Sequence, residues 1–245
     1  MIPLFAETDV LIVGSGPAGS VTARYAAEKG LRVTMIEQRA EVGVPVRCGE
    51  LMPSVQEIEG MFPNLTDAEE LFDVPADLMR RDIDSITLHA PNNRSYDFPF
   101  TGYTTDRDRF DQHLAHRAVD AGAELITGCR LDTAGEGIAK TTMGNISYRL
   151  IVGADGPGSR TAKALGLPAN RDPYPAVSSI AEGDFGSSVQ MFFGGLAPGA
   201  YAWIIPKDTE ANVGIGFAPR FAKGDLTGYM DKFVRDHDLR LTRKL

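Results

Sequence analysis

Two features of this chain combine residue types and spacing that could carry chemistry: one cysteine in an unusual setting and a glycine-rich turn. Cys48 lies in the segment GVPVRCGE, which is polar and contains glycine and proline, so a core thiol is not expected there. Its spacing from Cys129, the second of the two cysteines, fits neither a disulfide framework nor a metal motif. Cys48 is therefore either an inert packing residue or a functional thiol.

The glycine-rich turn is Gly14-Ser15-Gly16-Pro17-Ala18-Gly19, a complete G-x-G-x-x-G. It follows a nearly all-apolar run at 9–13, typical of a strand buried on both faces of a parallel sheet, and precedes an Ala-rich segment that predicts a helix over 17–29. Gly14 permits the tight turn, Gly16 lets the backbone approach a pyrophosphate at the helix N-terminus, and Gly19 allows close helix–strand packing. The turn predicts a dinucleotide site.

A second predicted strand, 32–36, ends in Glu37. An acidic residue roughly 20 positions beyond such a turn is placed to bind a ribose hydroxyl. A carboxylate there disfavours the 2′-phosphate of NADP. The turn alone leaves FAD and NAD as alternatives.

Composition narrows the class of partner. Of 245 residues, 43% are hydrophobic and 24% charged, and the net charge is -8. No basic cluster is present, which argues against nucleic acid. The cysteine usage suggests a reducing cytoplasm. The first 20 residues lack a basic region and a cleavage site, and no apolar run is long enough to span a bilayer, so neither a signal peptide nor a membrane span is expected.

The remaining elements predict two kinds of layer. A hairpin is expected within 85–100, a helix over 106–125 with Asp106 as its cap, a strand after it, and a helix from Ser159 following the turn Gly153-Ala154-Asp155-Gly156. Beyond residue 175 the pattern changes to short strands, which predict an antiparallel sheet, and then to a helix. The expected domains are 1–174, with an insertion at about 53–100, then 175–222, then a C-terminal helical segment at 223–245. The four histidines form no metal or triad spacing, so no metal is expected.

The motif series resembles the geranylgeranyl reductase family of flavoproteins, especially archaeal reductases that saturate the prenyl chains of membrane phospholipids. The series is G-x-G-x-x-G with Glu37, then VRCGE, DRDRF, GADGPGSR, APGAYAWIIPK and ANVGIGF, in that order. The resemblance implies an α/β fold: a Rossmann-like FAD/NAD(P)-binding domain with an antiparallel β-sheet substrate domain, as in FAD-dependent aromatic hydroxylases.

The resemblance also implies non-covalent FAD and hydride transfer to an isoprenoid C=C bond. The residues expected to bind the cofactor are Gly14, Gly16, Ala18, Gly19, Glu37, Gln38, Cys48, Gly49, Leu51, Arg107, Leu131, Asp155 and Gly156. Tyr201 and Trp203 are expected to line the prenyl pocket. An unactivated alkene needs a proton as the hydride arrives, and an apolar site favours the neutral thiol, so Cys48 is the candidate catalytic residue.

The expected partners are a prenyl lipid and an electron donor, either NAD(P)H or a ferredoxin-like protein. A lipid substrate is compatible with peripheral contact at the inner face of the membrane. This chain differs from the family pattern at Ile205, where a phenylalanine is usual, and it ends before a late Gly-Asp-Ala-Ala-like segment that closes over the flavin. Two alternatives therefore stay open: a flavin monooxygenase or halogenase on the same fold, and an inactive truncated nucleotide-binding fragment.

Overall fold

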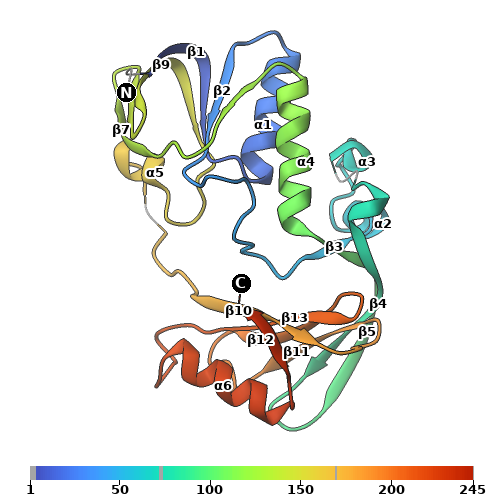
Figure 1. Cartoon of the computed structure of the whole chain (residues 1–245). Coiled ribbons are helices and arrows are strands. Elements are labelled where there is room, and N and C mark those ends of the chain that lie inside the picture. The colour runs from blue at the N-terminus through green and yellow to red at the C-terminus, as the bar shows by residue number, and fades with distance from the viewer. Residues whose placement is uncertain (1–3, 72–73, 169, 245) are drawn as a thin grey trace. The chain divides into compact units, whose positions relative to one another are not determined.

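A computed structural model describes residues 4–71, 74–168 and 170–244. The chain forms two compact units, each built from two separate stretches of sequence (Figure 1). Unit 1 comprises Met1–Pro45 and Asp108–Arg171, and unit 2 comprises Val46–Arg107 and Asp172–Leu245. The sequence-based division instead treats 53–100 as an insertion within the first domain. Among the described residues, no helix is long and apolar enough to cross a membrane.

Unit 1 contains a six-stranded sheet in the order β6-β2-β1-β9-β8-β7. The strands β6, β2, β1 and β9 are parallel, and β8 and β7 continue the sheet antiparallel. Its elements are β1 (Leu4–Val13), α1 (Pro17–Glu28), β2 (Val33–Ile36), α4 (Arg107–Asp120, whose first residue belongs to unit 2), β6 (Glu124–Ile126), β7 (Leu131–Gly135), β8 (Ile138–Thr141), β9 (Gly144–Gly153) and α5 (Arg160–Ala164).

Alternation along β1 gives unit 1 two apolar cores. Val10 and Ile12 point to the face where Ala23 of α1 and Ala118 of α4 pack. The neighbours of these two β1 residues, Leu11 and Val13, face the opposite core. Helix α1 begins with proline at its first turn and is followed by Gly30 at φ +78°, as the sequence predicts.

Unit 2 contains an eight-stranded sheet in the order β14-β10-β13-β12-β11-β4-β5-β3. Its elements are β3 (Leu51–Pro53), α2 (Val55–Met61), α3 (Ala68–Leu71), a 3₁₀ turn (Ala76–Leu78), β4 (Met79–His89), β5 (Ser95–Thr105), β10 (Ala176–Glu182), β11 (Ser188–Phe193), β12 (Tyr201–Pro206), β13 (Glu210–Gly216), α6 (Leu226–Asp236) and β14 (Leu241–Lys244). All neighbouring pairs are antiparallel except β11 and β4, which run parallel. The predicted antiparallel sheet is thus extended by the hairpin β4–β5.

The two faces of β12 and β13 differ in character. Ala202 and Ile204 of β12, with Val213 of β13, pack in one core with Phe233 of α6. Asp225 begins α6 by accepting a hydrogen bond from Gly228 N at 2.7 Å. Because successive strand residues alternate, Trp203 and Asn212 lie on the other face. That second face carries the polar groups described below.

Candidate functional site

The glycine-rich turn lies at the carboxyl edge of the parallel sheet in unit 1. Val13 is in register with Ile36 of β2 and Gly153 of β9, so the residues after these three strands gather at one edge. Gly14 N donates to Ile36 O at 2.8 Å, and Ala154 N donates to Val13 O at 2.8 Å. This edge therefore brings together the turn, Glu37 and the Asp155–Gly156 segment.

Each glycine of the turn meets a different constraint. Gly14 has φ +97°, and a Cβ there would lie 2.4 Å from Ala154 O. A Cβ on Gly19 would lie 1.9 Å from Gly14 O, so only glycine lets α1 start this close to β1. A Cβ on Gly16 would meet nothing within 4 Å. The open space is beside Gly16, where the first N–H groups of α1 have no partner within the helix. The turn thus fits a dinucleotide pyrophosphate.

Glu37 follows β2 and is half-buried. Its Oε2 accepts from Ser15 N at 3.1 Å and Ser15 Oγ at 3.3 Å, and its Oε1 accepts from Arg39 N at 2.9 Å. These bonds fix the carboxylate next to the glycine turn. A carboxylate oxygen has two lone pairs, so Oε1 retains capacity for a hydroxyl donor.

The Asp155 carboxylate stabilises the start of helix α5. It accepts hydrogen bonds from Ser159 Oγ at 2.6 Å, Arg160 N at 2.7 Å and Thr161 N at 3.0 Å. Burial acts to raise the pKa of Asp155, but the bonds from Ser159 and the two backbone N–H groups outweigh it and hold the pKa below 3.8. The carboxylate therefore holds the start of α5, and Gly156, at φ +78° with open space around it, presents the exposed backbone.

The other predicted residues of unit 1 differ in exposure. Ala18 and Gln38 are exposed beside the turn and beside Glu37 respectively. Leu131 is 1% exposed and packs in the core beneath β1, so its side chain is structural.

The second group of predicted residues surrounds Cys48 in unit 2. Cys48 is half-buried, and its Sγ accepts hydrogen bonds from Arg107 Nη1 at 2.9 Å and from Glu50 N at 3.2 Å. Glu50 has φ +69°, which closes the turn Cys48-Gly49-Glu50 tightly enough for the second of these bonds. Two donors, one of them cationic, therefore meet at the sulfur.

The turn Cys48-Gly49-Glu50 packs against the face of β12 that carries Trp203 and Ile205. A Cβ on Gly49 would lie 2.8 Å from Ile205 Cδ1, so glycine permits this approach. Leu51 and Trp203 pack against the small core of Ile83, Val189 and Ile205.

The aromatic residues predicted for a substrate pocket are neighbours on the same strand. The rings of Tyr201 and Trp203 are 5.9 Å apart and edge-on, and Tyr201 is 41% exposed. The indole of Trp203 lies over Gly214, where a Cβ would be 2.2 Å from Trp203 Cζ2. Trp203 and Gly214 are direct cross-strand partners. These rings form a partly exposed apolar wall next to the Cys48 turn.

A buried ionic group beneath the turn was not predicted from the sequence. Lys207, 4% exposed, donates from Nζ to Glu50 Oε1 at 3.2 Å and to Asp106 Oδ1 at 3.0 Å. Burial acts to lower the pKa of Lys207, but the charge of Glu50 and the bond to Asp106 raise it above its ordinary value. Arg80 also pairs with Asp106, the residue expected to cap α4.

These missed residues lie inside or beside motifs quoted above. Glu50 ends VRCGE, Asp106 precedes Arg107, Lys207 ends YAWIIPK and Asn212 lies in ANVGIGF. A lysine directly after an apolar strand, and an asparagine between apolar residues, were the signals available.

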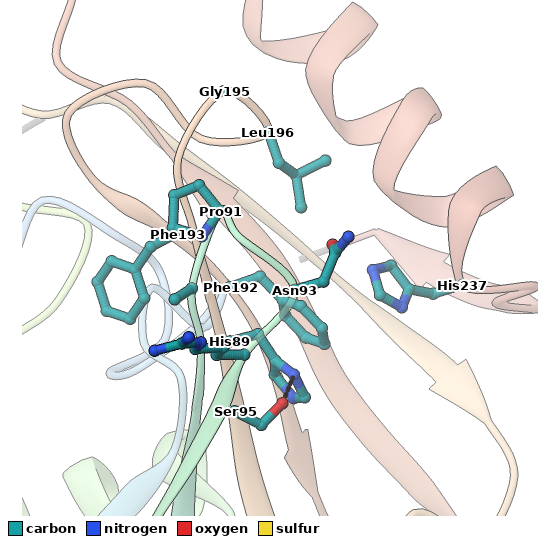
Figure 2. A pocket seen from close by; sticks show the side chains of 11 residues that line it. His89, Pro91, Asn93, Ser95, Phe192, Phe193, Gly195, Leu196 and His237 are labelled. Atoms are coloured by element: carbon teal, nitrogen blue, oxygen red, sulfur yellow. Dashed lines mark hydrogen bonds between the residues drawn. The ribbon is translucent and has the colours of Figure 1, made fainter.

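Unit 2 also contains a pocket of about 450 Å³ that holds none of the predicted site residues. Figure 2 shows His89 at the end of β4, Phe192 on β11 and His237 after α6 gathered at its wall. The rings of His89 and Phe192 stack at 4.3 Å, and His237 lies 4.4 Å from Phe192. Burial lowers the pKa of His237 below 6.5.

The fold and the glycine-rich edge define a dinucleotide-binding α/β protein with an added β-sheet unit. Residues 12–79 match the NAD(P)-binding Rossmann-like domain family, and residues 179–244 match the geranylgeranyl reductase catalytic domain. The chain belongs to the geranylgeranyl reductase family. The recognition from sequence motifs and the predicted fold class are confirmed.

Relatives support this assignment at the level of sequence. Digeranylgeranylglycerophospholipid reductase 2 of Methanosphaera stadtmanae is 34% identical over 233 residues, which cover 86% of this chain and 56% of the relative. The digeranylgeranylglycerophospholipid reductase of Methanocaldococcus jannaschii is 31% identical over 247 residues, covering 93% and 59% respectively. An uncharacterized protein from the nifH2 5′ region of Methanosarcina barkeri is 37% identical, covering 68% and 91%. The chain therefore spans less than two thirds of the named reductases.

Solved structures agree on the fold. A geranylgeranyl bacteriochlorophyll reductase-like protein from Thermoplasma acidophilum superposes with a TM-score of 0.83 at 27% identity, covering 99% of this chain and 66% of that protein. The myxobacterial FAD-dependent chondrochloren halogenase has a TM-score of 0.70 at 20% identity, covering 96% and 58%. The second likeness establishes the shared fold alone.

Proposed function

We propose that this chain forms the FAD-binding and alkene-reducing part of a prenyl lipid reductase. The named relatives are digeranylgeranylglycerophospholipid reductases, and the proposal extends their substrate class, geranylgeranyl chains on a glycerophospholipid, to this protein. The observation that carries the proposal is the environment of Cys48. A half-buried thiol with two donors at its sulfur lies beside an apolar aromatic wall.

The glycine turn and Glu37 are the residues proposed to hold FAD. Gly16 leaves room for the pyrophosphate beside the start of α1, and Glu37 accepts a ribose hydroxyl from its fixed position. The exposed backbone at Gly156 is the second proposed contact. When bound and reduced, FAD supplies the hydride that the reaction needs.

Reduction of an isolated C=C bond requires a hydride on one carbon and a proton on the other. Cys48 is proposed to donate the proton from its Sγ, which leaves a thiolate. Arg107 Nη1 and Glu50 N are already positioned to stabilise that thiolate. Solvent then returns the proton to sulfur. Tyr201 and Trp203 are proposed to hold the prenyl chain and to exclude water from the reacting bond.

Two partners complete the proposal. The electrons are supplied by NAD(P)H or by a ferredoxin-like protein. Since the substrate is a lipid, we propose peripheral contact with the cytoplasmic face of the membrane during turnover.

The test starts with the purified chain and added FAD. After removal of free FAD, the retained flavin spectrum is recorded, the sample is reduced with dithionite without oxygen, and a geranylgeranyl glycerophospholipid is added. The expected result is flavin reoxidation together with a lipid mass gain of two hydrogens per reduced bond. Retained flavin that reoxidises only with oxygen would favour the oxygenase alternative, and failure to retain flavin would favour the inactive fragment.

A further inference from the structure

We propose that Asn212 is a positioning residue that holds the Cys48 turn and the Trp203 ring as one rigid group. Asn212 is 0% exposed and lies on β13. Its Nδ2 donates to Cys48 O at 3.0 Å and to Glu50 Oε2 at 3.0 Å, and its Oδ1 accepts from Trp203 Nε1 at 2.9 Å. One side chain therefore bonds both ends of the turn and the aromatic wall. Its role in catalysis rests on the proposed function.

The orientation of the Asn212 amide follows from its partners. An indole N–H can only donate, so Trp203 must face the amide oxygen. A backbone carbonyl and a carboxylate can only accept, so Cys48 and Glu50 must face the amide nitrogen. Reversal of the amide would set donor against donor and acceptor against acceptor at 0% exposure, where an unmatched polar group is costly. The amide has one allowed orientation.

The pairing of β12 with β13 explains how Asn212 reaches both the Cys48 turn and the Trp203 ring. In the β12–β13 pair, Asn212 is opposite Ile205, and Trp203 is opposite Gly214. Asn212 and Trp203 are therefore diagonal neighbours on one face, and the missing side chain at Gly214 leaves room for the ring. The Cys48 turn packs on Ile205, directly beside Asn212.

The buried ion group holds the opposite side of the turn. Lys207 bonds Glu50 Oε1, while Asn212 bonds Oε2 of the same carboxylate. Each carboxylate oxygen of Glu50 is therefore fixed by a different residue, Oε1 by Lys207 just after β12 and Oε2 by Asn212 of β13. Glu50 N is left to bond Cys48 Sγ. Displacing Asn212 releases one carboxylate oxygen, the Cys48 carbonyl and the indole together.

The proposal is tested by measuring the mobility of the Cys48 turn and of the Trp203 ring after Asn212 is replaced. Asn212→Leu removes every bond of the amide at similar volume. We expect amide hydrogen exchange across 46–51 to quicken by about tenfold relative to β10 and β11, since several buried hydrogen bonds are lost together. Trp203 is the single tryptophan of the chain, so acrylamide quenching of its fluorescence reports the ring alone, and quenching should increase. The control is Ser179→Ala, a buried polar position on neighbouring β10.

Two further variants keep the test decisive if Asn212→Leu fails to fold. Asn212→Asp keeps the oxygen that accepts from Trp203 but lacks the amide donors, so it should quicken exchange at 46–51 with little change in quenching. Trp203→Phe removes the indole donor together with one ring of the indole and should also quicken exchange at 46–51. Exchange that is unchanged in every folded variant, or that rises uniformly through the sheet as with a merely structural residue, overturns the proposal.

The same variants separate this proposal from the proposed function. The exchange and quenching measurements need neither FAD nor lipid, so they decide the coupling even if the wild-type chain reduces no alkene. If it does, Asn212→Leu should lower kcat for alkene reduction at unchanged FAD affinity.

Discussion

The guanidinium of Arg107 donates from Nη1 to the Sγ of Cys48 across 2.9 Å, and the two residues are 59 positions apart in the sequence. Arg107 begins α4, and Cys48 lies in the turn before β3. Sequence motifs predicted both residues as contacts of a cofactor. The structure adds that they contact each other.

Replacement of Arg107 by leucine should slow alkylation of Cys48. The thiolate is the reactive form and Arg107 donates a hydrogen bond to the sulfur; a hydrogen bond to a charged group is worth about 1.5–3 kcal/mol, which corresponds to roughly tenfold to a hundredfold in rate. The measurement uses iodoacetamide in a Cys129→Ala background, so that one thiol remains. Arg47→Leu is the matched control, because Arg47 is an exposed arginine in the same segment. Equal alkylation rates in the two variants would contradict the prediction.

Replacement of Cys48 by serine should leave FAD binding intact and lower alkene reduction. A serine hydroxyl is a poorer acid, and general acid catalysis typically contributes about 10²–10⁴-fold, so a loss of this order is expected. The measurement is the rate at which lipid reoxidises the reduced protein. Cys129→Ser, at a buried position in unit 1, should retain the rate of any correctly folded protein. Full turnover by Cys48→Ser would return Cys48 to an inert packing role.

Alanine at two glycines of the turn should affect different properties, stability at one and FAD affinity at the other. A Cβ on Gly19 meets the backbone oxygen of Gly14, so Gly19→Ala should destabilise unit 1 by about 1–3 kcal/mol or more. Gly16→Ala meets no protein atom, so its free energy of unfolding should stay near wild type while FAD affinity falls. Urea unfolding and flavin fluorescence titration separate the two effects. Gly60→Ala, in α2 with open space around it, is the control. A Gly16→Ala variant that binds FAD normally would show that the pyrophosphate does not approach there.

Acid should weaken unit 2 partly through His237. Burial places its folded-state pKa below the ordinary value of 6.5, so the unfolded chain takes up the proton first. The stability that depends on the neutral ring is therefore complete above pH 6.5 and is lost as the pH falls through the folded-state pKa. His237→Phe, which keeps the ring packing on Phe192 and Phe233, should lose less stability than wild type between about pH 7.5 and about pH 5.

Urea titrations at several pH values measure this dependence. The exposed His116, changed to glutamine, serves as the control and should leave the pH dependence as in wild type. A His237→Phe profile parallel to wild type would exclude His237 as a source of acid sensitivity.

Local patterns were sufficient to predict most elements of the fold. The apolar run before Gly14, proline at the start of α1 and the Ser159 cap of α5 each depend on neighbouring residues only. The parallel pairing of β4 with β11 was not predictable, because Ser85 and Ser188 come into register across 103 positions. Strand β14 was missed for a related reason: a short polar segment gains strand structure only from its partner β10.

The residues of the candidate site also divide into those that local motifs predict and those that depend on long-range packing. Cys48, Arg107 and Trp203 belong to motifs that sequence alone can quote, and which of them act on substrate or cofactor stays a prediction. Lys207 and Asn212 were missed because their significance comes from burial beneath the turn, and burial depends on which face of β12 and β13 is covered.

The interleaving of the two units has a consequence for synthesis on the ribosome. Strand β4 emerges with its hairpin partner β5, but β11, which pairs along its other edge, is made about a hundred residues later. At roughly 5–20 residues per second, that edge waits about 5–20 seconds without a partner. The residues of β4 that later pair with β11, Ser85 to His89, directly follow the charged start of the strand, MRRDID, and charged residues on an edge strand discourage it from pairing with a second nascent chain.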